Sequence, residues 1–315
     1  KGWLPVSDDA VADVPVAPAT QRGLFAFGAV SGDQNISNKM NSSGVIADDT
    51  TGVGTARYAL GGTTYGGDKG VFAFGIDSGG NKNMSNKVSN QGVVATDTTG
   101  VGTARGAVGA SGYGGDKGIF GFGASGPLGI TNLVSNQGAI STDVAKASGV
   151  TAREALAATE YGGSSAGTCV FAYGGLADNL NMSNLVTNQG VMGSDVTGVG
   201  SFRWFVSAVG YGGDKGIFAW GASNDPPSYL TRNLVSNIGV IGSDVSTTSG
   251  TARHASSAAT YGGDKAAFAF QTMNNPTRYN STKNLVSNTG VISADVTGVG
   301  TGRSQAAAMG YSYSA

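Results

Sequence analysis

The sequence contains few of the residues on which long helices and catalytic centres depend. Its 315 residues include one cysteine, Cys169, one histidine, His254, and two glutamates, Glu154 and Glu160. A single cysteine excludes an intrachain disulfide, and one histidine leaves no partner for a metal site or a nucleophile relay. Scarce glutamate together with 54 glycines disfavours long helices. We therefore expect an all-β fold with many tight turns, and no metal or other cofactor.

Charge and long apolar runs are also scarce. The net charge is −1, so no strong attraction to phosphate backbones is implied and nucleic acid is not an expected partner. No run of about 18 apolar residues is present, which disfavours a membrane-spanning segment.

An internal repeat dominates the chain from residue 21 onward. An arginine recurs six times at spacings of 48 to 50 residues, and a tyrosine follows each arginine by eight residues. The arginines are Arg57, Arg105, Arg153, Arg203, Arg253 and Arg303, and the tyrosines are Tyr65, Tyr113, Tyr161, Tyr211, Tyr261 and Tyr311. Repeats of this length indicate one supersecondary unit used many times.

Each unit is expected to contain four short strands, a to d. Strand a follows the arginine, and the YGGDK sequence predicts a tight a–b hairpin because glycine and aspartate favour positive-φ turn positions. Strand b is the apolar GIFGFG-like run, whose phenylalanines alternate with small residues and so are expected to bury one side. Strand c is the NLVSN segment, which turns at Asn-Xaa-Gly into strand d. Four strands in about 50 residues predict a propeller blade, so we expect a six-bladed β-propeller spanning residues 21–315.

The chain ends predict a shared blade. The last unit stops after its strand a, within residues 301–315, and the first copy begins at strand b, within residues 22–49. Pairing these segments would close the ring and remove free sheet edges. Residues 1–20 match nothing downstream and contain three prolines, which predicts an extended N-terminal arm, either a plain linker or a docking arm.

The two faces of such a ring would differ in sequence diversity. The a–b turns are nearly uniform, whereas the b–c loops differ in length and content; these loops are residues 29–37, 76–85, 124–131, 175–183, 222–232 and 271–283. Variable loops on a rigid scaffold favour a recognition surface, although drift in unconstrained loops explains them about as well. The contact candidates in the two longest loops are Tyr229, Arg232, Arg278 and Tyr279.

An aspartate near the end of each unit accompanies the arginine. These residues are Asp49, Asp97, Asp143, Asp195, Asp244 and Asp295. Their repetition in every unit indicates structural anchors, with each arginine holding the d–a loop or the neighbouring blade and each aspartate capping a turn.

The sequence of the repeat resembles those of known families. An arginine, an Ala-rich strand, a tight turn and an apolar strand ending in glycine resemble the blade plan of kelch-type propellers, without the glycine pair and tryptophan of kelch blades. Three repeated segments, YGGDKGIFGFG (113–123), NLVSNQG (132–138) and TTGVGTAR (98–105), resemble segments of kelch-like repeat proteins of tailed bacteriophages. Those proteins are presumed tail or fibre components. This resemblance implies a virion protein, located in the extracellular particle.

What the resemblance implies is therefore a non-enzymatic structural or adhesive virion protein. Its expected partners are other virion proteins, reached through the N-terminal arm or the uniform face, and host glycans. A lectin-type carbohydrate-binding module is the main alternative. A propeller hydrolase is a remote one, and it would need Glu154 and Glu160 as paired acids in the channel.

Overall fold

The computed structural model describes residues 19–126, 128–176, 178, 180–223, 228–247, 250–274 and 277–315. Nearly all of the predicted N-terminal arm lies outside the described residues. The prediction of an all-β fold is confirmed, because the described chain consists of several small antiparallel sheets. One helical turn, α1 (Gly163–Ala166), replaces the a–b turn of the third unit.

Six sheets are built alike, each with an inner, a middle and a third strand. The inner strands are β3 (Gly61–Tyr65), β8 (Gly109–Tyr113), β11 (Ala157–Tyr161), β14 (Ser207–Tyr211), β19 (Ser257–Tyr261) and β22 (Ala307–Tyr311). The middle strands are β4 (Lys69–Ala73), β9 (Lys117–Gly121), β12 (Thr168–Ala172), β15 (Lys215–Ala219), β20 (Lys265–Asn274) and β1 (Arg22–Ala29). The third strands are β7 (Ser85–Val88), β10 (Thr131–Val134), β13 (Ser183–Val186), β16 (Thr231–Val235), β21 (Thr277–Val286) and β2 (Asp33–Met40).

The fourth strand that the repeat predicted is almost absent as a regular element. In each unit the segment after the Asn-Xaa-Gly turn touches the third strand mainly at isolated positions, such as Val88 with Val94 and Ser85 with Thr98. Only the fourth unit forms a short strand there, β17 (Val245–Ser246), which pairs with β16. The remaining short elements are β5 (Ile76–Asp77), β6 (Gly80–Asn81) and β18 (Arg253–His254).

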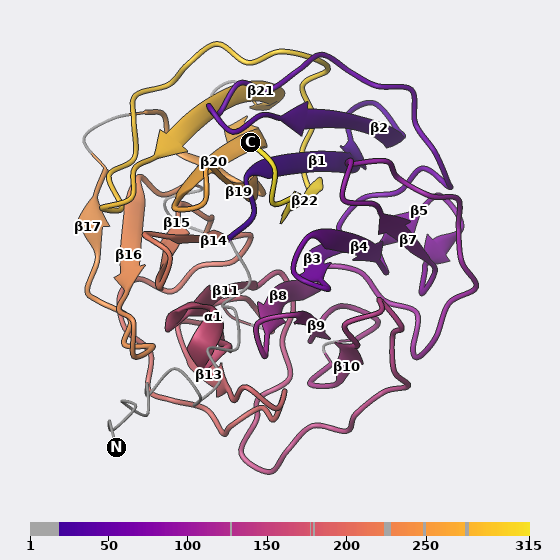
Figure 1. Ribbon diagram of the computed structural model, residues 1–315. Helices are drawn as coiled ribbons and strands as arrows, with labels where there is room; N and C mark the ends of the chain where they lie inside the picture. Colours follow the sequence, from indigo (N-terminus) through magenta and orange to yellow (C-terminus); the bar gives the residue numbers. More distant parts are fainter. Residues whose placement is uncertain are drawn as a thin grey trace, which may run out of the picture.

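The two ends of the described chain share one sheet. Strand β22 pairs antiparallel with β1, with Arg22 opposite Tyr311 and Ala26 opposite Ala307, and β1 pairs in turn with β2. The inner strands follow one another around a central axis in the order β3, β8, β11, β14, β19 and β22, and β22 contacts β3 again (Figure 1).

Two cycles of backbone hydrogen bonds join neighbouring sheets. In the first, with N···O distances of 2.7–3.1 Å, the residue two positions after each arginine donates to its counterpart in the preceding sheet: Ala59 to Gln305, Ala107 to Ala59, Ala155 to Ala107, Phe205 to Ala155, Ala255 to Phe205 and Gln305 to Ala255. In the second, at 2.7–3.0 Å, the residue after each repeated tyrosine donates to the next sheet: Gly66 to Asp116, Gly114 to Gly167, Gly162 to Asp214, Gly212 to Asp264, Gly262 to Gln21 and Ser312 to Asp68. Each cycle returns to its starting sheet after six steps.

The middle strands are buried on both faces, so the prediction of one-sided burial was wrong. On β4, Phe72 packs with Leu24 and Phe27 of the preceding sheet, whereas Val71 packs with Phe120 of the following sheet. Alternate side chains thus enter two different cores because each sheet lies between two others. Phe27 and Phe72 meet edge to face, with ring centroids 5.5 Å apart.

Candidate functional site

The repeated arginines lie inside the protein. Arg105 has no exposed surface, and its guanidinium donates to Phe122 O at 2.7 Å, to Thr103 O at 3.1 Å and to Asn132 Oδ1 at 2.6 Å. These acceptors come from the middle strand's end, the segment before the arginine and the third strand. One side chain therefore ties together three segments of its own sheet.

The same guanidinium also contacts the preceding sheet. The Arg105 Cζ atom lies 4.0 Å above the ring centroid of Phe74, which is a cation–π distance. The other five arginines stack in the same way: Arg57 on Phe27, Arg153 on Phe122, Arg203 on Tyr173, Arg253 on Trp220 and Arg303 on Phe270. All six have an exposed fraction of 0%.

The partner aspartate completes this polar brace. Asp143 accepts from Thr103 Oγ1 at 2.6 Å and from Asn132 Nδ2 at 2.9 Å, and it lies 3.9 Å from Arg105 Nη1. Burial alone would raise the pKa of Asp143, but the hydrogen bonds from Thr103 and Asn132, with Arg105 nearby, hold it below its ordinary value. Equivalent contacts occupy Asp49, Asp97, Asp195, Asp244 and Asp295. The arginine and aspartate side chains are thus engaged within the scaffold.

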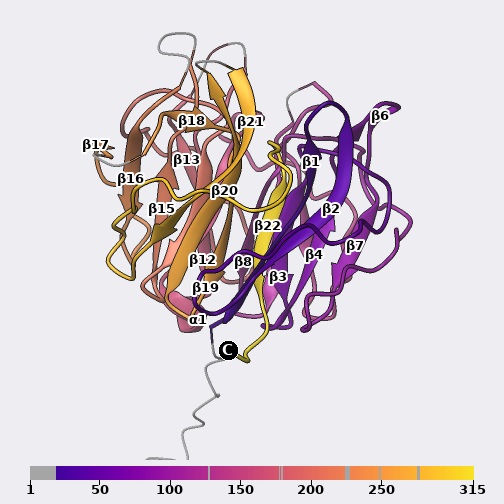
Figure 2. The same ribbon diagram turned by 90° about the horizontal axis from the view of Figure 1, so that it is seen from above.

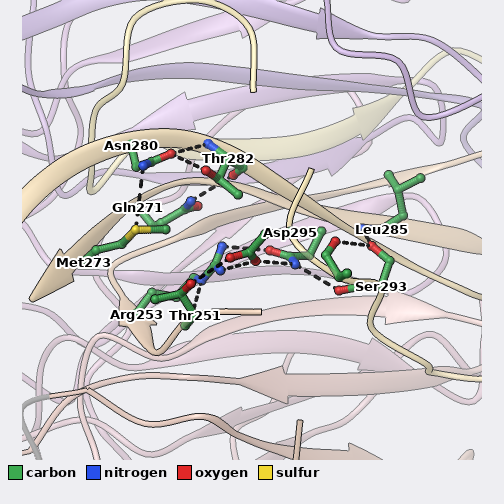
Figure 3. A network of polar contacts seen from close by, with 11 residues as sticks. Thr251, Arg253, Gln271, Met273, Asn280, Thr282, Leu285, Ser293 and Asp295 are labelled. Carbon is green, nitrogen blue, oxygen red and sulfur yellow. Dashed lines mark hydrogen bonds and ion pairs between the residues drawn. The ribbon is translucent and has the colours of Figure 1, made fainter. Parts of the chain in front are cut away.

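The fifth unit departs from this pattern (Figure 3). Here Arg253 donates to Thr251 O at 2.8 Å and to Asn284 Oδ1 at 2.7 Å, and it pairs directly with Asp295. The glycine that ends the middle strand in five units is replaced by Gln271, which is buried and donates to Thr282 O at 2.9 Å. Strand β20 extends three residues beyond this position, to Asn274, whereas β1 passes its own glycine, Gly28, by one residue.

The predicted loop at residues 271–283 is therefore a hairpin, and the loop prediction was wrong. Strands β20 and β21 remain paired as far as Asn274 and Thr277. Figure 2 shows the end of β21 and β6 on one side of the ring, and α1 with the C-terminus on the other. We call the first side the variable face, because the b–c segments lie there, and the second the uniform face.

The four contact candidates differ in exposure and in position. Arg278 and Tyr279 lie on β21 and are exposed, Tyr279 by 44%. Tyr229 is half-buried and bridges to Arg253 of β18. Because β18 pairs with β20, and β20 with β21, Tyr229 and Arg278 lie in one cross-strand row with Arg253 and Met273 between them.

Arg232 lies within a paired strand rather than on the exposed hairpin. It belongs to β16, where it faces Ala219 of β15 and Val245 of β17. The side chain is half-buried, and its Nε atom has no hydrogen-bond partner among the described residues. The structure thus places Arg232 inside a sheet, in contrast to the exposed Arg278.

The variable face carries a row of aromatic rings that was not predicted from the sequence. Trp204 contacts Phe205 with ring centroids 5.3 Å apart, and Phe205 lies 6.2 Å from the His254 ring. His254 Nδ1 is 3.0 Å from Ser228 Oγ, and burial lowers the pKa of this histidine. A signal was present in the sequence, because the residue directly after each invariant arginine varies: Tyr58, Gly106, Glu154, Trp204, His254 and Ser304.

A central cavity of about 430 Å³ lies between the inner strands and the a–b turns. Glu160 lines it, whereas Glu154 does not; Glu154 bridges to Gly175 on the variable face. The described positions therefore do not bring the two glutamates together in the channel. Cys169 is buried behind this wall, and burial raises the pKa of its thiol.

The uniform face carries short ion pairs within its turns. Lys69 and Asp68, Lys215 and Asp214, and Lys265 and Asp264 lie 2.5–2.9 Å apart, and Lys117 lies 3.6 Å from Asp116. Each pair joins adjacent residues at the surface, so its contribution to stability is small.

Within the described ranges, no group of three or more His, Cys, Asp or Glu side chains is arranged to hold a metal ion. No helix of the described part has the length and apolarity needed to cross a membrane. Comparison with models of known protein families and with curated protein sequences gives no match.

Proposed function

We propose that the six sheets form a six-bladed β-propeller that acts as a non-enzymatic structural and adhesive protein of a bacteriophage particle, in its tail or a fibre. The variable face would contact a host surface or another protein, and the uniform face would attach to other virion proteins.

The observation that carries this proposal is the contrast between scaffold and variable face. Every sheet repeats the same buried arginine, the same stacked aromatic ring and the same two backbone hydrogen bonds to its neighbours. The b–c segments and the residues after the arginines differ from unit to unit, whereas the a–b turn has the same YGGDK sequence in four of the units. A rigid, repetitive body that varies on one face is the arrangement used by recognition scaffolds. The phage assignment rests on the resemblance of the repeated segments to those of bacteriophage repeat proteins.

The exposed hairpin is the proposed centre of contact. Arg278 and Tyr279 project on β21, and tyrosine and arginine are enriched among the residues that dominate protein interfaces. The aromatic row Trp204–Phe205–His254 adds apolar surface on the same face.

Immunogold labelling of purified particles tests the proposal. Antibodies against the chain are expected to label the tail or its fibres at a constant position. Particles that lack the label, and whose proteins do not include this chain by mass spectrometry, would disprove a virion role.

A lectin-type module is the second candidate, favoured by the exposed Tyr279 and the half-buried Tyr229, whose rings are suited to stacking against sugar rings. On a glycan array, Tyr279→Ala and Tyr229→Ala are expected to weaken binding to any glycan that the wild-type chain recognises. The matched control is Tyr313→Ala, since Tyr313 lies near Asp68 and Lys69 on the uniform face. Equal binding by all three variants would reject a sugar site at these tyrosines.

A further inference from the structure

We propose that the central cavity is a binding site for a small organic cation with a primary ammonium group, and that Glu160 holds this group. The proposed site is independent of the contact surface on the variable face, and it opens toward the opposite side of the ring.

The two layers of residues that face the cavity from the inner strands contain almost no large side chains. Two positions of each inner strand face the axis, and one layer of these residues consists of Gly62, Ala110, Ala158, Ala208, Ala258 and Ala308. The layer nearer the uniform face consists of Thr64, Gly112, Glu160, Gly210, Thr260 and Gly310. Glu160 is therefore the one charged residue in either layer. A volume of about 430 Å³ falls within the range of about 300–1,000 Å³ that is usual for small-molecule sites.

The neighbours of Glu160 leave room beside its carboxylate. Gly112 and Gly210 occupy the same level on the two adjacent strands, β8 and β14. A Cβ added at Gly112 would overlap the Glu160 carboxylate, whereas one added at Gly210 would meet nothing closer than Lys215 O at 3.7 Å. The open space thus lies on the Gly210 side of the carboxylate.

Hydroxyl groups line other parts of the cavity. Thr20 Oγ1 and Thr260 Oγ1 are 2.8 Å apart, and a Cβ on Gly310, across the ring from Glu160, would overlap both. Thr64 lines the cavity from β3. The site therefore combines one carboxylate with three hydroxyl groups, all of which can accept a hydrogen bond.

Glu160 has no cationic partner of its own. No ion pair of the described residues includes it, and the two lysines that line the cavity, Lys215 and Lys265, pair with Asp214 and Asp264. The Glu160 side chain is exposed to the open cavity, yet the protein around it raises its pKa by desolvation, and the backbone N–H of Gly112 offsets only part of this effect. A bound cation would supply the missing counter-charge. The other ionisable groups lining the cavity are Tyr161 and Tyr211.

The chemistry of the wall selects among cations. A quaternary ammonium group is usually bound by an aromatic cage, and neither layer contains an aromatic side chain. A divalent metal ion requires several oxygen ligands, commonly more than one carboxylate. A primary ammonium group needs one charge-assisted contact to a carboxylate, and its remaining hydrogens can be accepted by water or by the threonine hydroxyls that line the cavity.

Isothermal titration calorimetry of the full chain with n-butylammonium chloride tests this site. One binding event per chain is expected, weakened about tenfold or more in Glu160→Gln, as the loss of one charge-assisted contact predicts. Glu154→Gln is the matched control, because it removes the other glutamate outside the cavity, and its affinity should equal that of the wild type. Tetramethylammonium chloride and sodium butyrate should bind at least about tenfold more weakly than n-butylammonium.

Several results would overturn the proposal. These are no heat of binding for n-butylammonium up to the highest soluble concentration, equal affinity of wild type and Glu160→Gln, or equal binding of tetramethylammonium. Circular dichroism of Glu160→Gln distinguishes a lost site from a lost fold. A Gly210→Leu variant fills the open side, and it is expected to abolish binding while Glu160 stays in place.

Discussion

Replacing one buried arginine tests a brace whose arginine and stacked aromatic ring recur in all six sheets. Arg153 is fully buried and donates to Tyr173 O at 2.8 Å, Thr151 O at 3.2 Å and Asn184 Oδ1 at 2.6 Å. Burial lowers the pKa of Arg153 to about 10, so the guanidinium remains charged at neutral pH. Its Cζ atom lies 4.2 Å above the Phe122 ring of the preceding sheet.

The change Arg153→Met keeps most of the apolar volume and removes every donor. It leaves two backbone carbonyls and the Asn184 amide oxygen without the guanidinium, and Asp195 without its nearby cation. Removing one partner from a buried charged network costs about 3–5 kcal/mol, so the free energy of unfolding should fall by that amount. For a chain of this length, that corresponds to a melting temperature lower by about 5–8 °C.

Urea unfolding followed by circular dichroism, together with calorimetric melting, measures this change. Arg278→Met is the control, because Arg278 is exposed on the hairpin and should change the free energy by less than about 0.5 kcal/mol. Arg153→Lys keeps the charge but loses the fork of donors, so it should fall between the two. Equal stability of Arg153→Met and Arg278→Met would refute the role of the brace.

Three further predictions concern pH and backbone geometry. The pKa of Asp97 is held below 3.8 by hydrogen bonds from Thr55 and Asn86 that outweigh burial, so its stabilisation is present above pH 3.8 and is lost as pH falls through the folded pKa; melting curves in acid should show this loss, and Asp97→Asn should flatten it. The raised pKa of Glu160 has the opposite sign, so Glu160→Gln should melt higher than the wild type above the folded pKa, and the gain should vanish below pH 4.5, measured by calorimetry against pH. Gly123 has φ +118° and an added Cβ would lie 2.7 Å from Gly106 O, so Gly123→Ala should lower the unfolding free energy by about 1–3 kcal/mol; Gly126→Ala, also at positive φ but with open space around it, should cost less, and equal losses would contradict the steric explanation.

Much of the scaffold could be predicted because it depends on local sequence. The YGGDK turn needs positive φ at its two glycines, and Gly66 and Gly67 have φ values of 59° and 77°. The residues that favour the apolar middle strand and the turn after it likewise recur in every repeat.

The remaining features depend on neighbours that are distant in the sequence. The aromatic residue at the end of each middle strand has positive φ, as in Phe122 at 62°, a conformation that propensity disfavours. It is held there because its carbonyl accepts from Arg105 of its own sheet and its ring lies under Arg153 of the next. No local pattern shows such a pair of contacts.

The variable face was the hardest part to predict. The differing length and content of residues 271–283 suggested a loop, yet the threonines and tyrosine there favour strand, and β20 runs on to Asn274. The cavity was not predictable either, because Glu160, Gly112 and Gly210 belong to different units and meet only when the sheets surround one axis.

Cryo-electron microscopy of intact particles that contain this chain tests the central proposal most directly. We expect density for a ring of six sheets at the tail or a fibre, with the uniform face toward the particle and hairpin β20–β21 pointing outward. Particles with no such ring, or with the hairpin face buried against the particle body, would contradict it.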